Sequence, residues 1–177
     1  LLAEDVNVAF PMVHWTTVSD ISPAKSPQSN TNDFGQLPVV ADEKHVWYPR
    51  NSEYEIFRTA GRGHTLGAIV VINHKTPLEL TAPPLAPVAA EVRKQGGLID
   101  FEKHNWPWSC MLAPVILPDL FELGNNHHWR TEYAVRNWAI PAPSWMNVEG
   151  TGTDTERGWT IFGFKTYYAL LNSGFRI

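Results

Sequence analysis

Apolar residues occur along this chain in short runs, separated by polar segments rich in Pro, Gly, Ser or Asn. The run at residues 66–72 is almost continuous, which is typical of a strand buried on both faces. Residues 19–38 show no such run and predict a loop. Shorter apolar or alternating runs predict further strands at residues 6–12, 39–48, 53–59, 98–101 and 119–123.

Two segments have the pattern of helices. Residues 85–95 follow a pair of prolines and end at a pair of glycines, which are typical entry and exit signals of a helix. The second helix is predicted over Glu156–Asn172, and its aromatic side chains are Trp159, Phe162, Phe164 and Tyr167. Because the predicted strands and helices alternate, the pattern favours an α/β fold with a mostly parallel sheet or a barrel.

Polar residues able to bind a metal ion or a substrate directly follow two of the predicted strands, 98–101 and 119–123. In parallel α/β proteins, groups just past the carboxyl ends of the strands line the active face. We therefore expect these residues to lie on one rim of a site. They are Glu102, Lys103 and His104 after the first strand, and Asn126 and His127 after the second.

Each of these residue types also has a structural interpretation. An imidazole such as His104 binds transition metals, but it can equally cap a strand end or bond a loop carbonyl. Lys103 could balance buried carboxylates or reach solvent. Trp106 could form the wall of a pocket for a flat ligand or belong to the core. The residues alone leave these alternatives open.

Composition narrows the class of protein. A chain of 177 residues suits one domain with a substantial core. Eight Trp and 14 Pro, with 18% charged residues, indicate an aromatic-lined, loop-rich protein rather than a helical bundle. The net charge of −4 gives no electrostatic basis for binding nucleic acid or an anionic membrane. The single cysteine, Cys110, excludes an internal disulfide and a cysteine-based zinc site.

Three catalytic or targeting patterns do not fit. The segment GRGHTLG at residues 61–67 has the wrong glycine spacing for a dinucleotide loop, and a strand rather than a helix is predicted after it. The sequence contains no GxSxG, so it offers no nucleophile elbow of a serine hydrolase. No apolar run approaches the roughly 18 residues of a transmembrane helix, and the compartment stays open.

Three segments together carry a resemblance to a known family. They are EYEIFRTAGRGHTLG at residues 53–67, GGLIDFEKHNWPW at 96–108 and DLFELGNN at 119–126. In order and spacing they resemble the central strands of PHP-type metallohydrolases, including the CehA/McbA-like branch. The resemblance covers roughly residues 1–130. It departs from the family at the third metal site, where this chain has EKHN in place of the usual His-Pro.

The resemblance implies a distorted (β/α)7 barrel and a cluster of divalent metal ions, such as Zn, Mn or Fe. By position, Glu55, His64 and His104 match the family's metal ligands. The family's opening HxH and closing Asp-x-His pairs would lie outside residues 1–177. We therefore expect this chain to be one domain that forms the central part of a larger PHP-like barrel, truncated at both ends.

Two functions follow from these expectations. The first is a metal-dependent hydrolase that uses metal-activated water on phosphoester or related bonds of a small-molecule substrate. The second is a catalytically silent PHP-like domain that binds a carbohydrate or another small ligand through Trp, Asn and His side chains. An unclosed parallel sheet would expose apolar edges, so a homo-oligomer is a further expectation.

Overall fold

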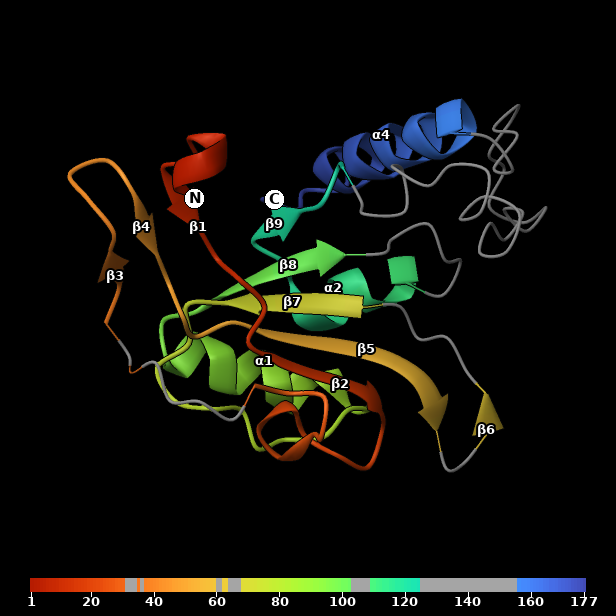
Figure 1. Ribbon diagram of the computed structural model, residues 1–177. Helices are drawn as coiled ribbons and strands as arrows, with labels where there is room; N and C mark the ends of the chain where they lie inside the picture. The colour runs from red at the N-terminus through yellow and green to blue at the C-terminus, as the bar shows by residue number, and fades with distance from the viewer. Residues whose placement is uncertain (31–34, 36, 60–61, 64–67, 103–108, 125–155) are drawn as a thin grey trace.

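A computed structural model describes residues 1–30, 35, 37–59, 62–63, 68–102, 109–124 and 156–177. In these ranges the chain forms a six-stranded sheet, a separate three-stranded sheet near the N-terminus, and helices that flank the larger sheet (Figure 1). Among the described residues, no helix is both long enough and apolar enough to cross a membrane.

The larger sheet has the strand order β2-β5-β7-β8-β9, and β6 pairs with the end of β5. Strands β2, β5, β8 and β9 run in one direction, while β7 runs antiparallel between β5 and β8. The strands are β2 (His14–Val18), β5 (Ser52–Thr59), β6 (Arg62–Gly63), β7 (Ala68–Ile72), β8 (Leu98–Glu102) and β9 (Leu120–Phe121).

The expected mostly parallel (β/α)7 barrel is therefore wrong. Both sheets mix parallel and antiparallel pairs, and in the described part of the chain β2 and β9 are opposite edges that do not meet. Only residues 60–67 separate β5 from β7, which is fewer than the dozen or more that a parallel crossover needs. The continuous apolar pattern of β7 correctly predicted a buried strand, but such a pattern does not report strand direction.

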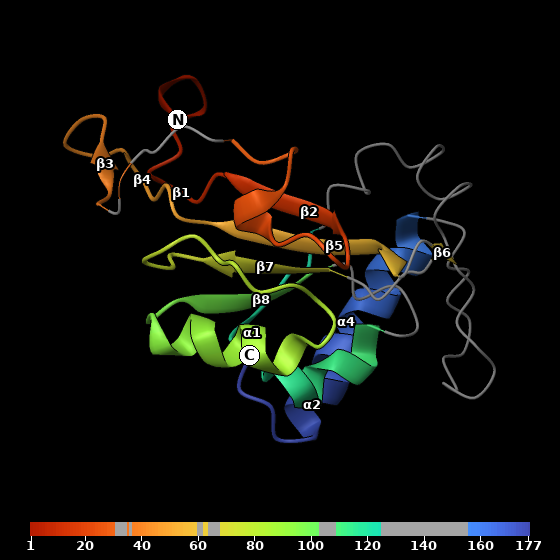
Figure 2. The same cartoon turned by 90° about the horizontal axis from the view of Figure 1, so that it is seen from below.

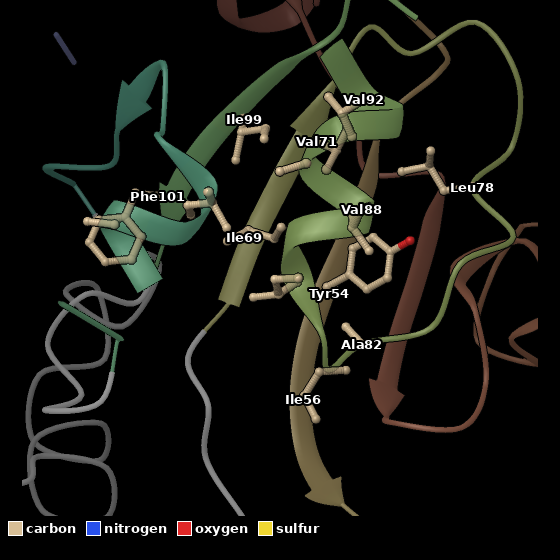
Figure 3. Packing of buried hydrophobic residues seen from close by; sticks show 14 residues of the cluster. Tyr54, Ile56, Ile69, Val71, Leu78, Ala82, Val88, Val92, Ile99 and Phe101 are labelled. Atoms are coloured by element: carbon tan, nitrogen blue, oxygen red, sulfur yellow. The ribbon is translucent and has the colours of Figure 1, made fainter. Parts of the chain in front are cut away.

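The connection from β7 to β8 contains helix α1 (Leu85–Lys94), yet these strands are also antiparallel. After β7, an extended segment first crosses the sheet, and the Tyr54 hydroxyl donates a hydrogen bond of 2.9 Å to the Leu80 carbonyl on the way. Helix α1 then returns across the same face, from the end near Ile56 to the end near Val71 (Figure 3). Because the chain crosses the sheet twice in opposite directions, β8 starts at the same end of the sheet where β7 ended, and Leu98 pairs with Ile72.

The core lies between α1 and the larger sheet. Val88 and Val92 of α1 face Ile69 and Val71 of the sheet (Figure 3). Each of these four residues is 0% exposed. The remaining members of this cluster come from α1 itself, β5, β8, α2 and the segment before α1: Tyr54, Ile56, Leu78, Ala82, Leu85, Ala89, Ile99, Phe101, Ala113 and Ile116.

Two further helices flank this core. Helix α2 (Ala113–Ile116) follows the short helix η3 (Ser109–Leu112), and Arg93 of α1 donates hydrogen bonds to the carbonyls of Ile116 and Leu117 at its end. Helix α4 (Glu156–Asn172) has the bounds that the sequence predicts. It lies beside β9, where the rings of Phe121 and Tyr167 are 5.4 Å apart (Figures 1 and 2).

The smaller sheet has the order β1-β4-β3, formed by β1 (Val8–Ala9), β3 (Val39–Val40) and β4 (Val46–Trp47). The strand predicted at residues 6–12 is reduced to β1, since Pro11 cannot donate to a ladder. The single strand predicted at 39–48 is a hairpin instead, because β3 and β4 pair antiparallel. The short helix η1 (Leu2–Glu4) precedes β1, whereas η2 (Pro23–Lys25) follows β2 and contacts β2 and β5 of the larger sheet.

The turn between α1 and β8 generates a prediction about packing. A Cβ added at Gly97 would lie 3.0 Å from the Ile72 carbonyl oxygen and 3.1 Å from Val92 Cγ1. We expect Gly97→Ala to lower the free energy of unfolding by about 1–3 kcal/mol, because backbone and a packed core side chain must shift. Urea denaturation measures this loss. Gly124→Ala, where a Cβ meets nothing within 4 Å, is the matched control and should change stability by less than about 0.5 kcal/mol.

Candidate functional site

The alternation of side chains along β5 and β8 builds a candidate site on the face of the larger sheet opposite α1. In β5, Tyr54 and Ile56 belong to the core, so Glu53 and Glu55 point to the other face. In β8, Ile99 and Phe101 belong to the core, so Asp100 and Glu102 point to that same other face. We call the four side chains Glu53, Glu55, Asp100 and Glu102 the acidic face.

Strand β7 separates the two pairs of carboxylates and fixes their register. Val70 lies opposite both Glu53 and Asp100, and Ala68 lies opposite both Glu55 and Glu102. Two strand spacings therefore separate the backbone of Glu53 from that of Asp100, and of Glu55 from that of Glu102, which is about 10 Å. Along one strand, the two acidic residues are about 7 Å apart. Ala68 has the smallest side chain in its row, so the longer side chains of Glu55 and Glu102 can approach each other above it.

The acidic face is shielded from water. Glu53, Glu55 and Glu102 are 4%, 7% and 5% exposed. Removing a carboxylate from water is costly unless cations or hydrogen-bond donors compensate the charge. Three such groups on one small surface therefore depend on donors or positive charge placed at this face.

Asp100 shows the effect of this environment most clearly. Burial raises its pKa to about 6, and a hydrogen bond from the Phe101 backbone N–H lowers it by a smaller amount. Its Oδ1 atom is buried, and no hydrogen bond satisfies that atom within the described residues. At neutral pH, Asp100 is thus largely an ionised carboxylate, and any cation or hydrogen-bond donor placed at this face would stabilise it.

Two of the predicted site residues, Glu55 and Glu102, lie on the acidic face and are brought to the same row of the sheet. Strands β8 and β9 pair in parallel, so their carboxyl ends lie at the same end of the sheet. The other predicted site residues lie outside the described residues: His64, Lys103, His104, Trp106, Asn126 and His127.

Sequence reasoning missed Glu53, Asp100 and Trp15. The signal was present, because EYEIF and LIDFE each alternate acidic and apolar residues with the period of a strand. Trp15 of β2 is paired with Glu53 and shares its face. The indole Nε1 of Trp15 is buried, and in the described part of the chain it has no hydrogen-bond acceptor.

The described residues contain no group of three or more His, Cys, Asp or Glu side chains close enough together to hold one metal ion. The acidic face by itself thus supplies pairs of carboxylates. A complete metal site built on it would need further donors, and the imidazoles that the sequence predicts, His64 and His104, are of the appropriate chemical type.

A separate polar cluster is buried on the α1 side of the sheet. The Ser52 hydroxyl lies 2.7 Å from His74 Nε2, and His74 Nδ1 lies 2.8 Å from the Thr76 carbonyl oxygen. Because a carbonyl only accepts, Nδ1 carries the proton and Nε2 accepts from Ser52. Ser52 and His74 are 0% and 1% exposed, so this pair resembles a catalytic dyad in its bonding but has no access to a substrate.

Comparison with known proteins gives no neighbour: no family model, no curated protein and no solved structure matches this chain. The resemblance to PHP-type metallohydrolases therefore stays a prediction from the sequence.

The first prediction from this site concerns Asp100 in protein freed of metal by a chelator. Its folded-state pKa lies above the unfolded value, so its contribution to stability falls as the pH rises from about 4 through 6. We expect Asp100→Asn to raise the free energy of unfolding at about pH 7, by on the order of 1–3 kcal/mol, and to have no such benefit below about pH 4. Urea denaturation across this range measures the effect, with the exposed Asp20→Asn as control. A loss of stability at neutral pH would contradict the account.

The second prediction concerns His74, whose pKa burial lowers to about 4. A histidine with a lowered folded-state pKa gives stability above its unfolded value of about 6.5, and this stability is lost as the pH falls from there toward 4. In wild type, this slope opposes that of Asp100. In wild type, protonation of His74 should lower the free energy of unfolding by on the order of 3 kcal/mol between these pH values. We expect this decrease to be absent in His74→Gln, whose side chain can keep both hydrogen bonds. Parallel slopes of stability against pH in wild type and His74→Gln would rule out the assignment.

Proposed function

We propose that this chain contributes carboxylate ligands to a divalent-metal-dependent hydrolase acting on phosphoester or related bonds. The observation that carries the proposal is the acidic face, on which Glu53, Glu55 and Glu102 are each less than a tenth exposed. The resemblance of residues 53–67, 96–108 and 119–126 to PHP-type metallohydrolases points to the same chemistry. The proposal concerns the site and its reaction and does not require a closed barrel.

The donor set suits a divalent cation. Carboxylate oxygens are favoured ligands of Mn²⁺ and Fe²⁺, and they complete zinc sites together with imidazole. Glu55 and Glu102 are the proposed ligands from the described residues, because they share one row across Ala68. His104 follows Glu102 by two residues and His64 follows β6 by one, so both are the proposed imidazole ligands.

A bound divalent cation supplies water of lowered pKa and polarises the bond to be broken. The chain's own residues provide the rest of the chemistry. Asp100, which is largely ionised at neutral pH, is placed to accept a proton on the acidic face. Trp15 borders Glu53 and offers an indole N–H toward a bound ligand. Lys103, Trp106, Asn126 and His127 are the proposed substrate-binding groups at the carboxyl ends of β8 and β9.

Metal binding tests the proposal directly. Chelator-treated protein is titrated separately with Zn²⁺, Mn²⁺ and Fe²⁺, and bound metal is measured by elemental analysis and calorimetry. We expect at least one of these ions to bind, and Glu55→Gln and Glu102→Gln each to weaken its affinity by about tenfold or more. Glu79→Gln is the matched control, because Glu79 is exposed and its carboxylate pairs with Lys25 at 3.2 Å.

Turnover separates the two function classes. The metal-loaded chain is assayed with p-nitrophenyl phosphate and bis(p-nitrophenyl) phosphate, and the proposal predicts metal-dependent release of nitrophenolate. Metal bound at Glu55 and Glu102 without turnover would leave a ligand-binding domain in place of an enzyme. Absence of metal binding, or variants that bind as the Glu79→Gln control does, would refute the metal site itself.

A further inference from the structure

A second titratable cluster lies away from the acidic face, in the smaller sheet. His45 precedes β4, and its side chain is 8% exposed. Its ring Nδ1 lies 2.7 Å from an Asp42 carboxylate oxygen in the turn between β3 and β4. Its ring Nε2 lies 3.1 Å from a carboxylate oxygen of Asp5, at the end of η1. One imidazole thus connects two segments that are 40 residues apart in the sequence.

Both contacts need a proton on the ring nitrogen. An ionised carboxylate only accepts hydrogen bonds, so a ring that bonds two carboxylates must donate from both nitrogens and is therefore an imidazolium. Asp42 is held ionised, because hydrogen bonds from the Lys44 backbone N–H, at 2.8 Å, and from His45 lower its pKa. In turn, the hydrogen bond to Asp42, followed by that to Asp5, raises the pKa of His45 against the opposing effect of burial.

We propose that His45 is a pH-sensitive latch that holds residues 1–6 against the β3–β4 hairpin when protonated and releases them when it loses its proton. A neutral imidazole keeps one N–H, so one of the two contacts becomes a lone pair facing a carboxylate. The contact to Asp5 is the longer one, and its carboxylate is 89% exposed, against 46% for Asp42. Asp5 can therefore return to water, and it is the partner that is lost.

The sign of the pH dependence follows from the direction of the shift. A histidine whose folded-state pKa is raised contributes stability that is present below its unfolded pKa of about 6.5. That contribution is lost as the pH rises through the raised value. The latch is therefore closed in mildly acidic solution and opens toward alkaline pH.

The surroundings confine the movement to residues 1–6. Val46 N–H donates to the Asn7 carbonyl and Tyr48 N–H to the Ala9 carbonyl, both at 2.9 Å, so β1 stays paired with β4. Beyond β1, the Asn51 amide donates to the Pro11 carbonyl at 2.9 Å and keeps the entry to β2 in place. The acidic face is thus unaffected, and the latch is independent of the proposed hydrolase site.

Release of residues 1–6 also changes a cavity. Leu1, Leu2 and Ala3 line a mainly apolar pocket of about 640 Å³ together with Ala9, Pro11, Ala41 and Trp47. Other charged side chains on η1 and on the β3–β4 turn are Glu4, Glu43 and Lys44. Within the described residues, the ring nitrogens bond to Asp5 and Asp42 and to none of these three. Opening the latch therefore removes residues 1–3 from the wall of this pocket without breaking another contact to the ring.

Two measurements on the intact chain test the latch. A ¹⁵N-detected NMR titration should show His45 with a pKa above about 6.5 and with both nitrogens protonated below it. Hydrogen exchange, corrected for the intrinsic rate, should show that protection of residues 1–6 falls as the pH passes through that pKa, while protection of β8 stays constant. Asp5→Asn should lower the His45 pKa and leave residues 1–6 unprotected at every pH, and Glu4→Gln should behave as wild type.

Asp5 is exposed, so Asp5→Asn is expected to fold, and Asp42→Asn provides a second variant that should lower the His45 pKa further. The latch is overturned by a His45 pKa at or below the ordinary value. It is equally overturned by protection of residues 1–6 that does not change with pH, or by an Asp5→Asn variant that keeps the wild-type profile.

Discussion

The packing of α1 on the larger sheet is the constraint on which the rest of this structure depends. It commits Tyr54 and Ile56 of β5, and Ile99 and Phe101 of β8, to one face. Since side chains alternate along a strand, the acidic residues between them must occupy the opposite face. A slip of either strand by one residue would place carboxylates against Val88 and Val92. The hydrophobic core thus holds the acidic face together by excluding registers shifted by one residue.

The same constraint explains why charge can accumulate there. Burial of the apolar residues against α1 supplies the favourable free energy, at roughly 25 cal/mol per Å² of apolar surface. Burial of carboxylates on the face opposite α1 costs free energy, as the raised pKa of Asp100 shows. A sheet stabilised on one face can tolerate electrostatic strain on the other, and strain of this kind is common where a protein binds a cation or performs acid–base chemistry. The proposed metal ion would relieve that strain, which gives the site a thermodynamic reason to be loaded.

Local patterns in the sequence predicted local structure well. Helix α4 begins and ends where expected, α1 ends one residue early, and the described part of the apolar run at 66–72, residues 68–72, is strand β7. The barrel was wrong because strand direction depends on how connections cross the sheet, and that information is spread over residues 60–67 and 73–97 rather than held in any strand. Likewise, Glu55 was expected as a ligand through a family resemblance, whereas the alternation in EYEIF and LIDFE puts Glu53 and Asp100 on polar faces and only the strand register brings these faces together. The partners of His45 could not be predicted, because Asp5 is brought to it by the pairing of β1 with β4.

The central claim is that the acidic face binds a divalent cation through Glu55 and Glu102. Anomalous X-ray diffraction from crystals of the chain grown with Mn²⁺ or Zn²⁺, recorded on both sides of the metal's absorption edge, tests it most directly. The account predicts an anomalous peak within about 2.0–2.2 Å of carboxylate oxygens of Glu55 or Glu102, on the face opposite α1. A map with no peak on that face, and with both carboxylates bonded only to protein cations or donors, would contradict it.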